Sequence, residues 1–191
     1  LIDYFIGVAD NILIGGGMAF TLLTAKGFEV GNSLVDQSKI SIATELIEKA
    51  KAKNNLMLPK DSICARSLDP TKAKKAYHVS KMPKNMTGLD IGPKTTEFFS
   101  SIINQSKTVI WNGPLGMFEN KDFCEGTLKL AECLAQNTEK GLISIAGGGD
   151  TASALRNFNL ENKMSHLSTG GGASIELLSG KTLPALFALE V

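Results

Sequence analysis

The sequence predicts an α/β protein in which a mostly parallel sheet is covered by helices on both faces. Short apolar runs alternate with amphipathic patterns along the chain, an order typical of parallel strands joined by helical crossovers. Three glycine triplets, at 15–17, 147–149 and 170–172, lead into helical patterns, and the first two follow strand-like runs. We therefore expect a three-layer, doubly wound, Rossmann-like domain over residues 1–191.

The strands and helices can be placed from these patterns. Strands are expected at 12–14, 56–58, 62–65, 108–111 and 142–146. Helices are expected at 38–52, from about 95 to 104 and from about 123 to 135, where apolar residues recur at helical spacing. Pro93 suits a first helical turn, and Thr95 is a possible helix cap. The lysine-rich segment 68–88, which contains Pro70 and Pro83, is expected to be an exposed excursion.

Composition excludes several classes of partner and site. The formal net charge is +1, so no strong field favours nucleic acid or a membrane surface as a partner. No apolar run is long enough to span a membrane. The three cysteines lack metal-binding spacing, which favours free thiols in the reducing cytoplasm. The chain begins at Leu1 rather than methionine, which predicts that it is part of a longer polypeptide.

The glycine triplets indicate an anionic ligand. Ordering a glycine costs roughly 0.5–1 kcal/mol relative to alanine, so three triplets at strand-to-helix junctions require a reason. Without a Cβ, backbone N–H groups can approach an anion closely, and the following helix N-terminus adds positive potential. The loop 111–119, rich in glycine and proline, follows another predicted strand and should lie at the same edge of the sheet. Together these loops predict a phosphate or nucleotide site.

The chain carries no motif of the commoner nucleotide sites. A Walker-type loop and the strict dinucleotide fingerprint are both missing, and no Lys, Arg or His lies within the triplets. Asp150 is the best candidate for binding Mg²⁺, which takes one or two carboxylates and completes its shell with phosphate and water. The alternative is that Asp150 is only a helix N-cap. Thr151 could donate to phosphate or be an ordinary first-turn residue, and Glu119 could accept ribose hydroxyls or simply be solvated.

Read together, these segments resemble the phosphoglycerate kinase family. The resemblance rests on motifs that occur in the family's order and span nearly the whole chain. They are residues 14–21 (IGGGMAFT), 88–95 (GLDIGPKT), 111–114 (WNGP), 147–151 (GGGDT) and 165–174 (SHLSTGGGAS). The family transfers phosphate reversibly between 1,3-bisphosphoglycerate and Mg-ADP, giving 3-phosphoglycerate and Mg-ATP, so the resemblance implies a phosphotransferase of glycolysis with Mg²⁺ as cofactor.

The resemblance also implies roles for single residues. An apolar slot for adenine would be lined by Gly17, Leu34, Gly88, Leu89 and Met117. Around the ribose and phosphates would lie Asn112, Pro114 and Glu119, with Glu119 on the ribose hydroxyls, Asp150 on the metal and Thr151 on the phosphates. Backbone N–H groups of Gly148, Gly149, Gly171 and Gly172 would hold the phosphate in transfer, so catalysis would depend on positioning and preorganised dipoles.

Only the carboxyl-terminal, nucleotide-binding half of the family is matched. The glycerate site belongs to an amino-terminal domain absent from this chain, as does a lysine-bearing segment that would precede Leu1. The residues after Leu183-Pro184 also depart from the family pattern. We therefore expect a monomeric, two-domain parent enzyme, and we expect this chain alone to bind adenine nucleotide without turnover. The alternative is a stand-alone nucleotide-binding module. A nicotinamide-dependent oxidoreductase is disfavoured by the missing dinucleotide fingerprint.

Overall fold

The computed structural model describes residues 1–69, 73–168, 170 and 180. The first elements are α1 (Ile2–Val8), β1 (Ile12–Leu13), α2 (Gly16–Ala25), the 3-10 turn η1 (Gln37–Lys39), α3 (Ile40–Lys51) and β2 (Leu56–Met57). The middle of the chain forms β3 (Asp61–Ala65), β4 (Lys75–His78), the 3-10 turn η2 (Val79–Lys81) and β5 (Thr87–Ile91). The last described elements are α4 (Pro93–Ile103), β6 (Thr108–Asn112), α5 (Glu125–Thr138), β7 (Ile143–Gly147), α6 (Gly149–Asn157), the 3-10 turn η3 (Glu161–Lys163) and β8 (His166–Ser168).

The described strands form three small sheets. β1 pairs with β2 in parallel, and β6, β7 and β8 form a second parallel sheet in that order. The third sheet has the order β4-β3-β5 and is antiparallel. The α/β class and its mostly parallel pairing are confirmed. The division among three sheets and the antiparallel unit were not predicted.

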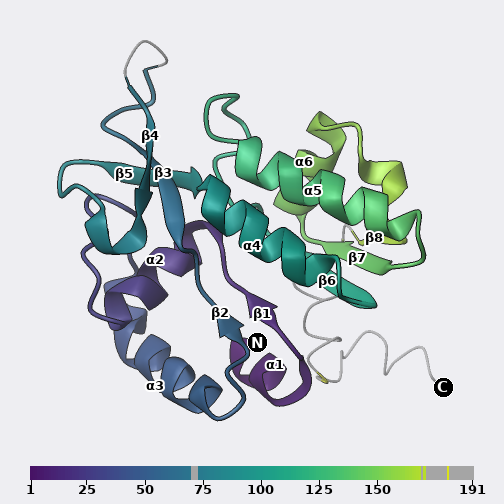
Figure 1. Ribbon diagram of the computed structural model, residues 1–191, viewed down its shortest axis with the longest axis horizontal. Coiled ribbons are helices and arrows are strands. Elements are labelled where there is room, and N and C mark those ends of the chain that lie inside the picture. The colour runs from purple at the N-terminus through teal and green to yellow at the C-terminus, as the bar shows by residue number, and fades with distance from the viewer. Residues whose placement is uncertain (70–72, 169, 171–179, 181–191) are drawn as a thin grey trace.

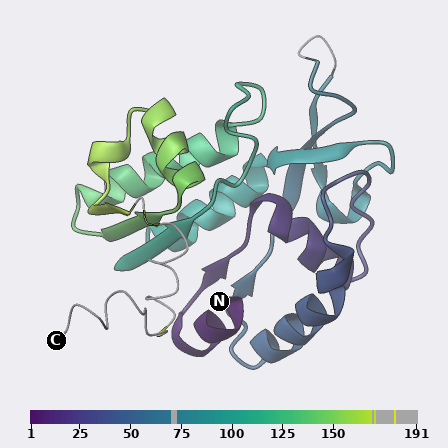
Figure 2. The ribbon, with the colours of Figure 1, turned by 180° about the vertical axis from the view of Figure 1, so that it is seen from behind.

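Helices cover the strands from both sides (Figures 1 and 2). α4 and α5 pack together on the side of β6 and β7 that faces the viewer in Figure 1, and α6 lies on the opposite side, nearer the viewer in Figure 2. α2 and α3 pack against each other, and α3 lies beside β2. Within the described residues, no helix is long and apolar enough to cross a membrane.

The largest apolar cluster lies where α4, α5 and α6 meet the strands. Phe99 of α4, Ala131 of α5 and Leu155 of α6 are fully buried in it. A second cluster joins Phe20 and Leu23 of α2 to Cys64 of β3. This arrangement follows from the apolar stripes of the amphipathic helices, which bury one face against the sheets.

The segment 68–88 is exposed over much of its described length, as its composition predicts, but it also contains secondary structure and buried positions that were not predicted. β4 and η2 lie within it, and Val79 and Met82 are buried in the cluster that contains Phe20. Lys74 and Lys75 are exposed, whereas the apolar residues that follow pack inward. The lysines obscured the apolar positions, so the sequence pattern suggested a solvated loop.

The sequence suggested Thr95 as a possible cap of α4, but Thr95 does not occupy the N-cap position. The N-cap is Gly92, and Thr95 lies fully buried inside the first turn. Its hydroxyl accepts hydrogen bonds from the N–H groups of Lys60 and Asp61, each at 3.0 Å. The Asp61 carboxylate in turn accepts the N–H groups of Lys94 at 3.1 Å and Thr95 at 2.8 Å. A carboxylate from β3 therefore caps α4.

Replacing this hydroxyl should destabilise the fold. Thr95→Val keeps the side-chain shape but leaves the N–H groups of Lys60 and Asp61 without their acceptor in a buried setting. We expect the free energy of unfolding, measured with urea, to fall by about 2–3 kcal/mol. Thr44→Val, at an exposed position in α3, is the control and should change it by less than about 0.5 kcal/mol. Equal stabilities of the two variants would contradict the role assigned to Thr95.

Candidate functional site

A cavity of about 310 Å³ opens between α2, β5 and the loop that follows β6. Six residues that sequence reasoning proposed for nucleotide binding line it: Gly17, Leu34, Gly88, Leu89, Pro114 and Met117. These residues come from four separate segments of the chain, so the fold brings them together. The remaining wall is mostly apolar and includes Phe20, Leu23, Val79 and Ile91.

Leu34 stands at the mouth of this cavity. Its side chain is 75% exposed, and its Cδ2 lies 3.1 Å from where a Cβ on Gly17 would be. The loop that carries it is fixed by Ser33, whose hydroxyl accepts the Gly88 N–H at 2.9 Å and donates to the Val30 carbonyl at 2.5 Å. An apolar side chain is thus held out of the core beside an apolar cavity.

Gly88 is required by the packing of the cavity floor. A Cβ at this position would lie 2.3 Å from Cζ of Phe20 and 2.8 Å from Oγ of Ser62. Because glycine leaves this space free, the Phe20 ring can lie directly against β5. Phe20 was not proposed from the sequence, although it belongs to the same motif as Gly17.

The loop 113–117 forms the opposite wall, and its backbone is firmly held. The Thr127 hydroxyl accepts the N–H groups of Leu115 at 3.1 Å and Gly116 at 3.0 Å. Met117 donates its N–H to the Leu89 carbonyl at 2.8 Å, and Gly16 donates to the Leu115 carbonyl at 3.2 Å. The first glycine triplet is therefore hydrogen-bonded to this wall.

The second glycine triplet lies against the start of the same loop. Gly148 has a φ of +99°, and a Cβ there would lie 2.7 Å from Oδ1 of Asn112. The hydroxyl of Thr151, which is fully buried, accepts the Gly113 N–H at 2.7 Å. Among the described residues, none comes within 4 Å of where a Cβ on Gly149 would lie, and Gly149 is exposed at the N-terminus of α6. This position suits an anion, because the first N–H groups of a helix lack partners within it.

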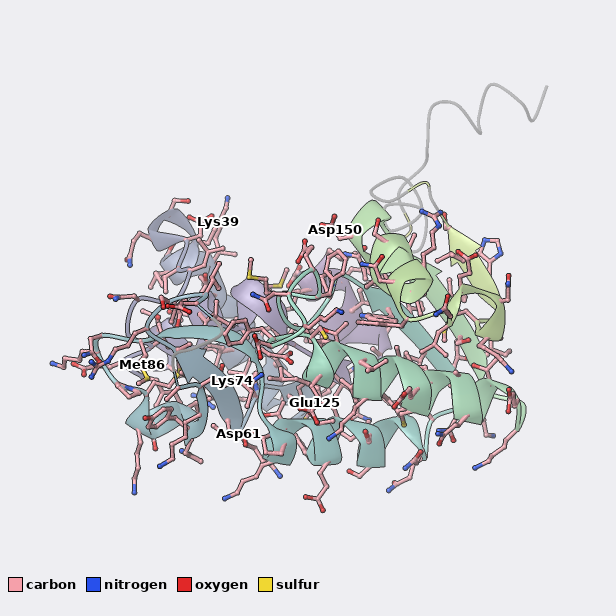
Figure 3. The ribbon with its side chains drawn as sticks, turned by 90° about the horizontal axis from the view of Figure 1, so that it is seen from above. Lys39, Asp61, Lys74, Met86, Glu125 and Asp150 are labelled. Carbon is pink, nitrogen blue, oxygen red and sulfur yellow. The ribbon has the colours of Figure 1, made fainter. Side chains whose placement is uncertain are left out.

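Asp150 lies in the first turn of α6 and is exposed (Figure 3). It is not the N-cap, contrary to one expectation, because Gly148 occupies that position. Among the residues that the structure describes, no three His, Cys, Asp or Glu side chains gather as a metal site. A cation here would take Asp150 as its protein carboxylate and the rest of its shell from a bound ligand and water.

The other proposed residues lie apart from the cavity or outside the described chain. Asn112 is exposed at the end of β6, and Glu119 is exposed in a turn of the following loop. Neither lines the cavity, and nor do Gly148, Gly149, Asp150 and Thr151. Gly171 and Gly172, proposed to hold a transferring phosphate, lie outside the described residues, as does Leu183-Pro184.

Sequence reasoning missed a buried acid in the cavity wall. Asp90 of β5 is 4% exposed and lies between Leu89 and Ile91. Its carboxylate accepts the Gly126 N–H at 2.7 Å and its neighbour Ile91's N–H at 2.8 Å. Burial raises the pKa of Asp90 to about 7 despite these hydrogen bonds. The signal was present, since an acidic residue inside a short apolar strand is a buried charge that needs partners.

The architecture and the cavity define a Rossmann-like α/β protein whose candidate site lies where loops join strands to helices. The family model of phosphoglycerate kinase matches residues 1–181, and the chain belongs to this family.

Relatives of known name agree with this assignment. The chain is 46% identical over 191 residues to phosphoglycerate kinase of Prosthecochloris aestuarii. This alignment covers 100% of this chain and 48% of the relative. Identity to the cytosolic phosphoglycerate kinase of Nicotiana tabacum is also 46% over 191 residues, with the same coverage. The solved structure of phosphoglycerate kinase from Coxiella burnetii superposes with a TM-score of 0.91 at 39% identity, covering 97% of this chain and 47% of that one. The chain thus spans about half the length of the relatives it matches.

The raised pKa of Asp90 predicts a pH dependence of stability. The folded protein holds this proton up to about pH 7, whereas the unfolded chain releases it near the ordinary aspartate pKa of 3.8. The stabilising contribution is therefore complete below about pH 4 and is lost as the pH rises to 7. Asp90→Asn removes this titration. Relative to that of the variant, the unfolding free energy of the parent should fall across this window and stay constant at higher pH. A constant difference from pH 4 to 8 would contradict the prediction.

Proposed function

We propose that this chain is the carboxyl-terminal, nucleotide-binding domain of a two-domain phosphoglycerate kinase, and that adenine binds in the cavity between α2, β5 and the loop 113–117. One observation carries the proposal. The five residues assigned to adenine by resemblance, from Gly17 to Met117, all line this one cavity. An apolar cavity of about 310 Å³ suits a nucleobase, because ligand sites are concave, mostly apolar and largely preformed.

The phosphates would extend from the cavity towards the second glycine triplet. Gly148 and Gly149 would present backbone N–H groups, and the N-terminus of α6 would add positive potential. Asp150 suits Mg²⁺ because its carboxylate is exposed and makes no hydrogen bond or ion pair within the described residues. Bound Mg²⁺ would neutralise phosphate charge. Asn112, Pro114 and Glu119 would border the ribose and phosphates, while Thr151 would hold Gly113 in place for them.

The reaction of the whole enzyme would be the transfer of phosphate between 1,3-bisphosphoglycerate and Mg-ADP. The chain alone is expected to bind nucleotide without this transfer. No Lys, Arg or His lines the described cavity, and a transferring phosphoryl group needs cationic stabilisation beyond backbone dipoles. The glycerate substrate would be bound by the other domain. A cytoplasmic location would match that of the tobacco relative, which is named as cytosolic.

Calorimetry with ADP tests the proposed function. The chain should bind ADP at submillimolar to millimolar concentration, more tightly with Mg²⁺, and should show no phosphoglycerate-dependent ATP turnover above a buffer control. Leu34→Ala should weaken ADP binding several-fold through lost contact with the base. It should leave the unfolding free energy within about 0.5 kcal/mol of the parent, because Leu34 is exposed.

A matched core variant separates binding from folding in this test. Leu155 is fully buried and does not line the cavity, so Leu155→Ala should cost roughly 2–5 kcal/mol of stability. No ADP binding at millimolar concentration would overturn the proposed function. A large stability loss in Leu34→Ala would instead make Leu34 structural and move the base elsewhere.

Asp150→Asn tests the metal assignment. The change preserves size but removes the charge that Mg²⁺ prefers. ADP affinity measured with Mg²⁺ should fall about tenfold, whereas affinity measured with a chelator present should change less than about twofold. The unfolding free energy should stay close to that of the parent, because Asp150 is exposed and does not cap α6. Equal losses with and without Mg²⁺ would show that Asp150 does not bind the metal.

A further inference from the structure

Asp90 occupies the junction between the cavity wall and α5. Its Oδ2 accepts the N–H of Gly126 in the first turn of α5, while Oδ1 accepts the N–H of Ile91 in β5. The packing around it is tight. A Cβ on Gly116 would lie 2.1 Å from Asp90 Oδ1, and a Cβ on Gly126 would lie 2.6 Å from the same atom. The carboxylate thus fills the space between β5, the loop 113–117 and α5.

The same turn of α5 also holds the cavity wall. Thr127, the residue after Gly126, accepts the N–H groups of Leu115 and Gly116. Asp90 therefore joins this turn to β5 through Gly126, and the next residue, Thr127, joins it to the wall. Two neighbouring residues, Gly126 and Thr127, thus connect Asp90 to the wall.

Two other polar side chains of the cavity, Asp61 and Ser62, make hydrogen bonds of their own. Asp61 caps α4 through the N–H groups of Lys94 and Thr95. Ser62 donates its hydroxyl to the Asp90 carbonyl at 2.7 Å. Of the two lining carboxyl groups, that of Asp90 is the one hydrogen-bonded to α5, the helix that also holds the wall 115–117.

We propose that Asp90 is a proton-linked positioning residue for the nucleobase: its carboxyl group holds the wall 115–117 against α5 and takes up a proton when the base fills the cavity. The inference rests on the proposed function, because it requires a base in this cavity. The proton comes from solvent and binds one oxygen of the Asp90 carboxylate.

The physical reason for proton uptake is desolvation. Asp90 lines the cavity, so a base that fills it would exclude solvent from that side of the residue, and further desolvation disfavours the charged form. Three groups near it are titratable or charged: Glu125 and Cys124 at the start of α5, and Lys74 before β4. Lys74 is shared with Asp122, to which it is ion-paired at 2.7 Å. Figure 3 shows Lys74 and Glu125 in the region where α5 meets the antiparallel sheet. In the free protein the Asp90 pKa near 7 leaves a substantial ionised fraction available for protonation at neutral pH.

Adenosine is the probe for the test, because it carries no phosphate that titrates near neutral pH. Its affinity should be highest near pH 6 and should fall as the pH rises towards 9, by about tenfold for each unit by which binding raises the Asp90 pKa. Carboxyl-carbon NMR titrations, free and saturated with adenosine, should show that shift directly. In Asp90→Asn the affinity should become independent of pH, and the missing resonance identifies Asp90.

Two charge variants give graded controls that leave Asp90 in place. Glu125→Gln removes a negative neighbour and should move the midpoint of the affinity profile to lower pH. Lys74→Gln removes a positive neighbour and should move the midpoint to higher pH. Both should retain the pH dependence, and both positions are surface-exposed, so they decide the question even if Asp90→Asn does not fold.

The outcomes separate this inference from the proposed function. Adenosine affinity that is constant from pH 6 to 9, with an Asp90 carboxyl pKa unchanged by saturation, would overturn the role of Asp90 and leave nucleotide binding intact. Failure of both ADP and adenosine to bind would overturn the proposed function and this inference with it. A pH dependence that persists unchanged in Asp90→Asn would assign the proton to another group.

Discussion

Two buried threonine hydroxyls hold the loop on which the candidate site depends. Thr127 of α5 accepts the N–H groups of Leu115 and Gly116, and Thr151 of α6 accepts that of Gly113. Both side chains are fully buried. Buried backbone N–H groups need partners, and a short irregular loop cannot supply them from its own backbone. Side chains from two helices therefore fix one wall of the cavity and, through it, the position of both described glycine loops.

The glycines of these loops serve two different purposes. Gly15, Gly16 and Gly148 are required by close packing: a Cβ on them would meet Leu115, Pro114 or Asn112 within 3 Å. Gly149 is exposed instead, and no described residue would meet a Cβ there, so packing within the described part of the chain does not explain its lack of a side chain. Close packing therefore accounts for Gly148, which the sequence had suggested as a phosphate contact. In the two described triplets, some glycines let the chain pass close to the segment 112–115, and the exposed Gly149 leaves room at the N-terminus of α6.

The sequence was sufficient to predict the order of most elements and the cavity, but not the polar contacts across the fold. Leu34 and Met117 were assigned to one slot because their motifs resemble a known family, and both line the same cavity. Asp61, Thr95 and Asp90 were missed or misassigned because their partners lie 28 or more residues away in the chain. Local patterns describe caps within one helix, whereas here a strand carboxylate caps the helix. The buried positions within segment 68–88 were missed for a related reason, since only the tertiary packing buries Val79 and Met82.

The antiparallel sheet ends on an edge strand, and that has a consequence for association between molecules. β4 pairs only with β3 in the described structure, so its outer side carries unpaired backbone groups that could pair with a strand from another molecule. Lys74 and Lys75 mark the start of β4, and Lys75 is exposed. Positive charges on an edge repel the same edge of a second copy, and the strand itself is only four residues long. The lysines that made this segment look like a solvated loop thus protect the molecule against sheet-to-sheet aggregation.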